Sequence, residues 1–170
     1  MDEQQKARES AVDFLKKVLV EIERLAAEYP GAIYVRPHGF RECSYVVGGF
    51  TGEGKLPTTC GCIVGQAIRN VDPKISAWLE QPEFSTMKAV DMFWGLLEEH
   101  FAMSYAEDEA PDHTQLMRAQ MIDLIERVQA NQDAGHSWMN AIDYTKSFYD
   151  LPEDKPLVES FSLVTYAEED

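Results

Sequence analysis

The sequence predicts a single α+β domain that is mainly helical and contains a small β-sheet. Apolar residues recur with helical spacing over several long stretches, and short β-branched and aromatic runs lie between residues 32 and 47. The composition, 45% hydrophobic and 11% aromatic in 170 residues, is sufficient for a sizeable core. We therefore expect one domain over residues 1–170, with an amphipathic N-terminal helix over 1–29 and an acidic C-terminal extension over 151–170.

The first 29 residues carry the clearest helical pattern. Apolar side chains alternate at spacings of four and three, which places them in one stripe: Ala11, Leu15, Val18, Ile22, Leu25 and Tyr29. Pro30 and Gly31 end the pattern. Because an exposed stripe of this size would promote aggregation, we expect it to be buried, either on the domain itself or across a homodimer.

A small sheet and two helices are predicted next. Residues 32–35 and 43–47 have the composition of strands, and the glycine-rich segment from residue 48 to residue 59 is expected to be a flexible loop. A helix then begins at Cys60 or Gly61 and continues to Val71. A short helical piece over residues 74–80 follows.

Three further helices are predicted in the second half of the chain. The first is capped at residue 85 or 86, and the second is capped by Asp112, with Gln115 in the capping-box position. Gly135 ends the second helix. Ser137 caps the final helix, whose apolar residues are Trp138, Ala141, Ile142 and Phe148.

The C-terminal extension combines a strand pattern with a high negative charge. Phe161, Leu163 and Thr165 alternate with other residues as in a strand. Residues 150–170 hold seven acidic residues against Lys155 alone, a local charge of -6, and residues 107–112 add four more acids. Charge gathered in a tail and a loop is typical of a solvated or partner-steering segment.

The charge of the whole chain limits its partners. A net charge of -15 and a pI near 4.6 argue against direct binding to nucleic acid or to an anionic membrane surface, and they favour a basic protein partner. No apolar run reaches membrane-spanning length, and the N-terminus lacks the pattern of a signal peptide. We therefore expect a cytoplasmic protein whose cysteines are thiols.

The segment around Cys60 is the most plausible place for chemistry. The segment from residue 36 to residue 69 contains four basic and two acidic residues, which gives it a local charge of +2. A helix that begins at Cys60 would favour a thiolate or a bound anion there, so Cys60 is the candidate reactive thiol. The candidate anion or ligand site comprises Arg36, His38, Arg41, Thr59, Cys60, Gly61 and Arg69. No histidine is singled out as a base, so the sequence does not predict an enzyme.

A zinc site is an alternative use of the cysteines. His38, Cys43, Cys60 and Cys62 have the right number and type of ligands for a tetrahedral site. Their spacing differs from that of structural zinc sites, because one residue separates the last two cysteines and sixteen separate the first two. The sequence favours Cys43 and Cys62 as buried core thiols, and we expect neither a metal nor another cofactor.

A polar motif near the end of the long C-terminal helix is the last candidate. It comprises Gln129, Gln132, Asp133 and Trp138. Its polar side chains are expected to satisfy backbone amides, those of the strand at Cys43 among them, while Trp138 packs the corner between two helices. The functional alternative is a polar ligand site.

Two stretches resemble a known family. Residues 43–46 (CSYV) and 62–68 (CIVGQAI) form the first, and residues 128–142, with the pattern QxxQDxGxxW, form the second. Together they resemble a family of small proteins of unknown function encoded by actinobacteria and their bacteriophages. The resemblance implies a phage or actinobacterial cytosol and implies no activity. Cys60, the N-terminal helix and the acidic tail lie outside it.

These observations favour an accessory protein that binds a host or phage protein in host modulation or defence. One alternative is a small-ligand or cysteine-based enzyme site at Cys60. Another is an acidic DNA mimic that inhibits a nucleic-acid-binding protein. A mimic needs an extended acidic face with few interleaved cations, whereas an enzyme needs a pocket that joins Cys60 to a histidine.

Overall fold

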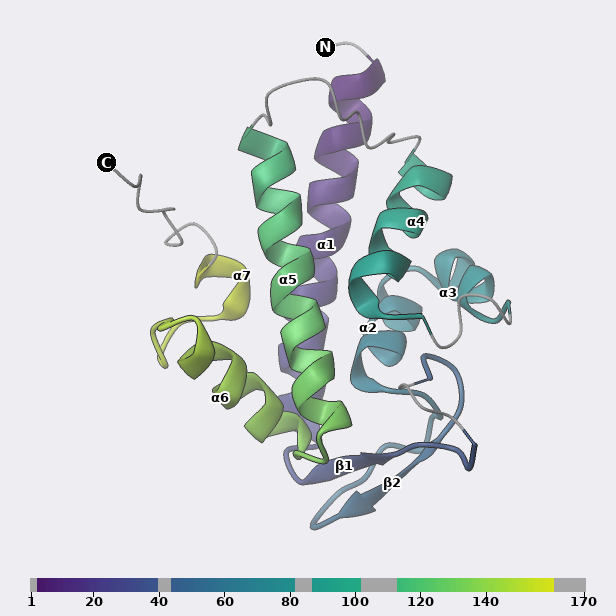
Figure 1. The fold of residues 1–170 in the computed structure, drawn as a ribbon, viewed down its shortest axis with the longest axis vertical. Coiled ribbons are helices and arrows are strands. Elements are labelled where there is room, and N and C mark those ends of the chain that lie inside the picture. The colour runs from purple at the N-terminus through teal and green to yellow at the C-terminus, as the bar shows by residue number, and fades with distance from the viewer. Residues whose placement is uncertain (1–2, 40–43, 82–86, 102–112, 161–170) are drawn as a thin grey trace.

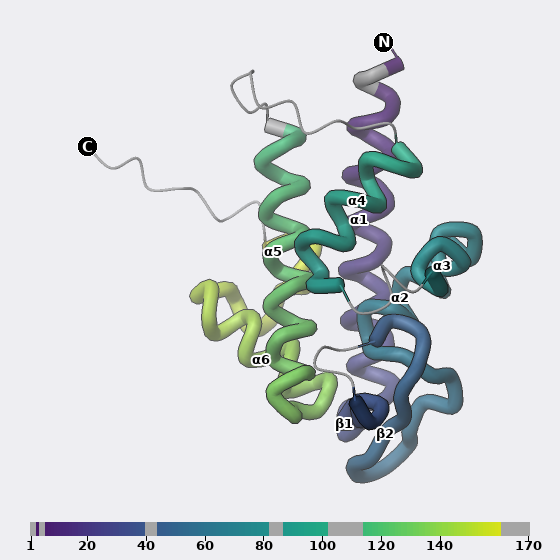
Figure 2. Tube along the Cα trace, turned by 45° about the vertical axis from the view of Figure 1, so that its right-hand side comes forward, coloured from purple at the N-terminus to yellow at the C-terminus, as the bar shows by residue number. Residues whose placement is uncertain are grey.

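The fold is organised around the N-terminal helix, α1 (Glu3–Glu28). The computed structural model describes residues 3–39, 44–81, 87–101 and 113–160. Within them α1 contacts α2 (Ile63–Val71), α4 (Ala89–Phe101), α5 (His113–Asp133), α6 (Trp138–Phe148) and α7 (Leu157–Ser160). Figures 1 and 2 show α4 and α5 lying along α1, with the sheet at one end of the three helices. The predicted fold class, mainly helical α+β, is confirmed.

The apolar stripe of α1 is buried inside the chain. Leu15, Val18 and Ile22 have no exposed surface, and Leu25 is 3% exposed. The alternating spacing of four and three places these side chains toward α2, α4 and α5, where they form part of one continuous core. The stripe therefore packs on the domain itself. None of the helices in the described ranges combines the length and the apolar character that crossing a bilayer requires.

The sheet contains two antiparallel strands, β1 (Ala32–Val35) and β2 (Gly49–Gly52), with Ala32 opposite Gly52. The predicted strand at residues 43–47 is wrong for residues 44–47, and the predicted loop supplies β2 instead. The Ser44 hydroxyl accepts from the amide of Val47 at 3.2 Å, which bends this segment. β2 needs glycine, because Gly52 has a φ of +120° and a Cβ on it would lie 1.9 Å from the Gly31 carbonyl oxygen.

Helix boundaries follow local capping chemistry. α2 begins at Ile63 with Cys62 as its N-cap, so the predicted start at Cys60 or Gly61 is wrong. The predicted helix at residues 74–80 is α3 (Pro73–Leu79), which Asp72 caps through bonds to two backbone amides. Gly135, with a φ of +90°, follows α5 as predicted.

The remaining boundary predictions divide into two groups. Ser137 caps α6, and its hydroxyl accepts from the amide of Asn140 at 3.4 Å, so that prediction is confirmed. The expected caps at residues 85, 86 and 112 and the strand pattern at residues 161–165 lie outside the described residues. Helix α7 precedes that strand pattern and packs on α1.

Candidate functional site

Cys60 does not lie at the helix N-terminus that the sequence predicted. Cys62 occupies the N-cap, where its sulfur accepts from the Gly65 amide at 3.5 Å and is fully buried. Cys60 lies two residues earlier, exposed, and its carbonyl oxygen accepts from Arg69 Nη1 at 3.4 Å. Cys60 therefore does not occupy the helix N-terminus, the position on which its prediction as a reactive thiol depended.

The neighbours of Cys60 attach the loop to α2. The Thr59 hydroxyl donates to Gln66 Oε1 at 2.9 Å, and Gln66 Nε2 donates to the carbonyls of Thr59 at 2.9 Å and Gly61 at 3.1 Å. A Cβ on Gly61 would lie 2.2 Å from the Tyr45 carbonyl oxygen. Thr59 and Gly61 thus have structural roles that the sequence did not indicate.

Of the other members of the predicted anion and metal sites, Arg69 contacts the Cys60 carbonyl. Arg36 and His38 are exposed on the segment that follows β1, and Arg41 and Cys43 lie outside the described residues. Across the described ranges no group of three or more His, Cys, Asp or Glu side chains is placed to hold a metal ion. Cys62 is buried, as predicted, within an apolar neighbourhood.

The polar motif of α5 and α6 forms a set of internal hydrogen bonds, which we call the buried latch (Tyr45, Ile63, Gln129, Gln132 and Trp138). Gln132 Oε1 accepts from the Ile63 amide and from Trp138 Nε1, both at 2.9 Å. The Tyr45 hydroxyl donates to the carbonyl of Met87 at 2.7 Å and lies 3.1 Å from Gln129 Oε1. Gln132 therefore satisfies a backbone amide as expected, although the amide is at the start of α2.

Close backbone contact fixes the latch in place. The segment at Tyr45 lies so near the first turn of α2 that a Cβ on Gly65 would be 1.9 Å from the Tyr45 carbonyl oxygen. The Trp138 ring meets those of Phe50 and Tyr29 edge-on, with centroids 5.0 and 6.0 Å away. The latch consequently joins β2, the end of α1, α2, α5 and α6, and it is an architectural feature.

Aromatic side chains are exposed on the flank of α6, beside its buried face. Tyr144 is 52% exposed and Phe148 is 60% exposed, although the sequence grouped Phe148 with the apolar residues of this helix. The Arg127 guanidinium of α5 lies 3.7 Å from the Phe148 ring centroid, and the His136 ring lies 4.5 Å from that of Tyr144. We call this surface, formed by Arg127, His136, Tyr144 and Phe148, the aromatic face.

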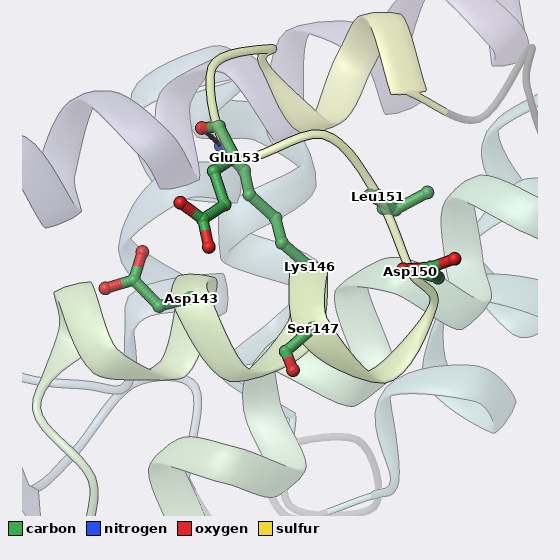
Figure 3. Close-up of a pocket in the computed structure, with 6 residues that line it drawn as sticks. All are labelled: Asp143, Lys146, Ser147, Asp150, Leu151 and Glu153. Atoms are coloured by element: carbon green, nitrogen blue, oxygen red, sulfur yellow. Dashed lines mark hydrogen bonds between the residues drawn. The ribbon is translucent and has the colours of Figure 1, made fainter.

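A pocket of about 550 Å³ lies between α6 and the segment that follows it (Figure 3). Its lining residues are Asp143, Lys146, Ser147, Asp150, Leu151 and Glu153.

Lys146 is directed into the protein. Its side chain is 12% exposed, and Nζ donates to the Glu153 carbonyl at 3.3 Å and lies 3.5 Å from Glu23 Oε1. The second oxygen of Glu23 accepts from the Leu157 amide at 3.0 Å. Burial raises the pKa of Glu23, while these partners oppose that rise.

The pocket carries excess negative charge. Within the part of the chain that the structure describes, no cation lies at ion-pair distance from the carboxylates of Asp143, Asp150 or Glu153. Figure 3 shows the carboxylates of Asp143 and Glu153 pointing toward one another across the opening. The carboxylates of Asp143 and Glu153 face one another, and the neighbouring Lys146 is already bonded to other groups. The pocket is therefore suited to binding a positively charged group.

Sequence reasoning missed the aromatic face and the pocket. A signal was present: Tyr144 and Phe148 are four residues apart, and Tyr144 falls outside the buried stripe of Trp138, Ala141 and Ile142. No pattern in the sequence indicates that Asp143 and Glu153 face one another, because their arrangement depends on how the chain turns back after α6.

Comparisons with protein-family models, curated proteins and solved structures found no match for this chain.

Proposed function

We propose that this protein acts by binding another protein, with the aromatic face as the central contact surface. The proposed setting is that of an accessory protein in an actinobacterial or phage-infected cytosol, where it modulates the host or takes part in defence. The observation that carries the proposal is the exposure of Tyr144 and Phe148, side by side on α6 and more than half accessible.

Aromatic side chains of this kind suit a protein interface. Tyr, Phe and Arg are enriched at interface centres, where a rigid ring buries a large area and loses little conformational entropy. Tyr144 and Phe148 are neighbours at a spacing of four residues. The stacking of Arg127 on Phe148 restrains both side chains before a partner arrives, which lowers the entropic cost of binding.

The two alternative functions have less support. The hypothesis of a cysteine-based site required Cys60 to lie at a helix N-terminus, but Cys62 occupies that position. A DNA mimic depends on an acidic face with few cations, and the exposed acids along α1 are interleaved with cations. The paired side chains there and nearby are Asp13 with Lys17, Glu21 and Glu28 with Arg24, and Glu28 with Lys55.

Photo-crosslinking tests the proposal. A crosslinking amino acid is placed at position 144 or 148, or at position 20 as the control, since Val20 is 51% exposed on α1. The full chain is incubated with lysate of cells in which it is naturally made, and crosslinked proteins are identified. The expected result is one protein captured from positions 144 and 148 and absent from position 20. That protein, once purified, should bind the wild type and Val20→Ala and lose affinity for Phe148→Ala.

Two results decide against the proposal. Equal affinity of the purified partner for Phe148→Ala and wild type would exclude the aromatic face. Capture of a nucleic-acid-binding protein that duplex DNA displaces, without dependence on Phe148, would favour the mimic.

A further inference from the structure

We infer that the aromatic face and the adjacent pocket together receive a basic segment of the partner, an inference that rests on the proposed function. An apolar side chain of that segment packs on Tyr144 and Phe148. A neighbouring lysine or arginine enters the pocket between Asp143 and Glu153.

The two surfaces are continuous because of helical spacing. On α6, Asp143 and Ser147 are neighbours at a spacing of four, Ser147 and Tyr144 at three, and Tyr144 and Phe148 at four. Ser147 is exposed and lines the pocket, so it joins the pocket to the aromatic face. A segment that crosses α6 at this level therefore contacts a ring and a carboxylate together.

The charge of the pocket selects a cation. Three carboxylates and one ammonium line it, and the ammonium, Lys146 Nζ, is already engaged by Glu23 and the Glu153 carbonyl. An acidic or neutral side chain would leave these carboxylates uncompensated in the interface, which carries a desolvation cost. A lysine or arginine head group compensates them.

The shape of the pocket suits a long side chain. Its volume of about 550 Å³ exceeds what one side chain requires, so water remains around the charged group. Leu151 supplies an apolar wall for a methylene stem, while the carboxylates receive its charged end. The facing of Asp143 and Glu153 in Figure 3 allows an arginine to be held from two sides.

Peptide selection on the folded full-length protein tests the inference. A display library of random 12-residue peptides is selected against the wild type and counter-selected against Phe148→Ala. The enriched peptides are expected to contain lysine or arginine beside an aliphatic or aromatic residue. Affinities of the best peptides are then measured for the double variant Asp143→Asn with Glu153→Gln and for Asp154→Asn. Asp154 is exposed, lies next to Glu153 and does not line the pocket, so it controls for a general charge effect.

The double variant should bind these peptides about fivefold or more weakly, as expected for the loss of two partly exposed ion pairs. The affinity for Asp154→Asn should change less than twofold, and replacing the basic residue of the peptide by citrulline or glutamine should reproduce the loss.

Four results would overturn the inference, and they separate it from the proposed function. Peptides that need Phe148 but lack basic residues would refute the basic segment, and so would peptides that bind the double variant as well as the wild type. Either result would leave the proposed role of the aromatic face standing. If Asp154→Asn weakened peptide affinity as much as the double variant, the overall negative charge of this region, and not the pocket, would explain the preference for basic peptides. A library without any Phe148-dependent binder would overturn the inference and count against the proposed function.

Discussion

The buried latch and the aromatic face share α6, where the exposed rings flank the buried side, and the two surfaces use polar groups in opposite ways. In the latch, Gln132 satisfies two internal donors, and Trp138 is fully buried. On the outer side, Tyr144 and Phe148 are more than half exposed and the nearby carboxylates are not ion-paired among the described residues. The conspicuous sequence motif therefore serves the architecture, whereas the exposed aromatic and acidic side chains come from less conspicuous residues.

The two regions differ in how much a substitution lowers the free energy of unfolding. A buried donor or acceptor that loses its partner retains the full cost of desolvation, so the latch has little tolerance for substitution. An exposed side chain that is truncated leaves its surroundings in water, so the aromatic face can change without loss of the fold.

Gly65→Ala should destabilise the protein by ~4 kcal/mol, because the added Cβ would lie 1.9 Å from the Tyr45 carbonyl oxygen. Gly95→Ala in α4 is the matched control, since its nearest contact beyond the helix is Trp78 at 3.7 Å. Helix propensity alone makes Gly95→Ala neutral or stabilising by up to ~1 kcal/mol. Urea unfolding measures both, and equal stabilisation of the two variants would show that the segments around Gly65 and Tyr45 are not in contact.

Gln132→Ala should lower the free energy of unfolding by about 2–4 kcal/mol. The substitution leaves the Ile63 amide and the Trp138 indole N–H without their acceptor in a buried site. Asn140→Ala, on the exposed side of α6, serves as the control and should change stability by less than ~0.5 kcal/mol. A loss for Gln132→Ala as small as that of the control would contradict the latch.

The alkylation rates of Cys60 and Cys62 test whether the first turn of α2, where the latch is attached, stays closed. Alkylation of the native protein at neutral pH should label Cys60 before Cys62, because Cys60 is exposed and Cys62 is fully buried. Cys62→Ala should cost about 1–3 kcal/mol of stability. Labelling of Cys62 should become faster in Gln132→Ala, and peptide mapping distinguishes the sites. Preferential labelling of Cys62 in the wild type would show that the first turn of α2 opens independently.

Glu23 should give stability a pH dependence of defined sign. Burial raises its pKa in the folded state above the usual 4.5, so the folded protein binds this proton more tightly than the unfolded chain. The contribution of Glu23 to stability therefore falls as the pH rises from 4.5 through the folded-state pKa. Stability of Glu23→Gln relative to the wild type should increase over that window in urea titrations. A relative stability that decreases with pH would mean that Lys146 and the Leu157 amide outweigh burial.

Phe148→Ala should change stability by less than ~0.5 kcal/mol, the smallest effect in this series, because the side chain is 60% exposed. Phe93→Ala in α4 provides the contrast, since its fully buried ring should cost about 3–5 kcal/mol. A comparable loss for Phe148→Ala would mean that its contact with Arg127 supports the fold and does not merely restrain the aromatic face.

Local chemistry made several elements predictable. The α1 stripe, the stop at Gly135 and the Ser137 cap depend on residues that are near one another in the chain, so spacing and side-chain type were sufficient. The start of α2 was misplaced by two or three residues, since Cys62 competes with Cys60 for the cap and packing against Ser44 and Tyr45 selects between them.

Residue type and spacing were sufficient to predict the helical class, the burial of the α1 stripe, the excess of negative charge and the burial of Cys62. Tertiary structure decided that the glycine-rich segment pairs with β1, that Gln132 reaches the start of α2, and that Asp143 faces Glu153 across a pocket. Gln132 and Ile63 are 69 residues apart, and the pairing of such distant groups follows from how the whole core packs. Periodicity reports on one element at a time, whereas a surface formed by α6 and the chain that turns back beside it exists only once both are in place.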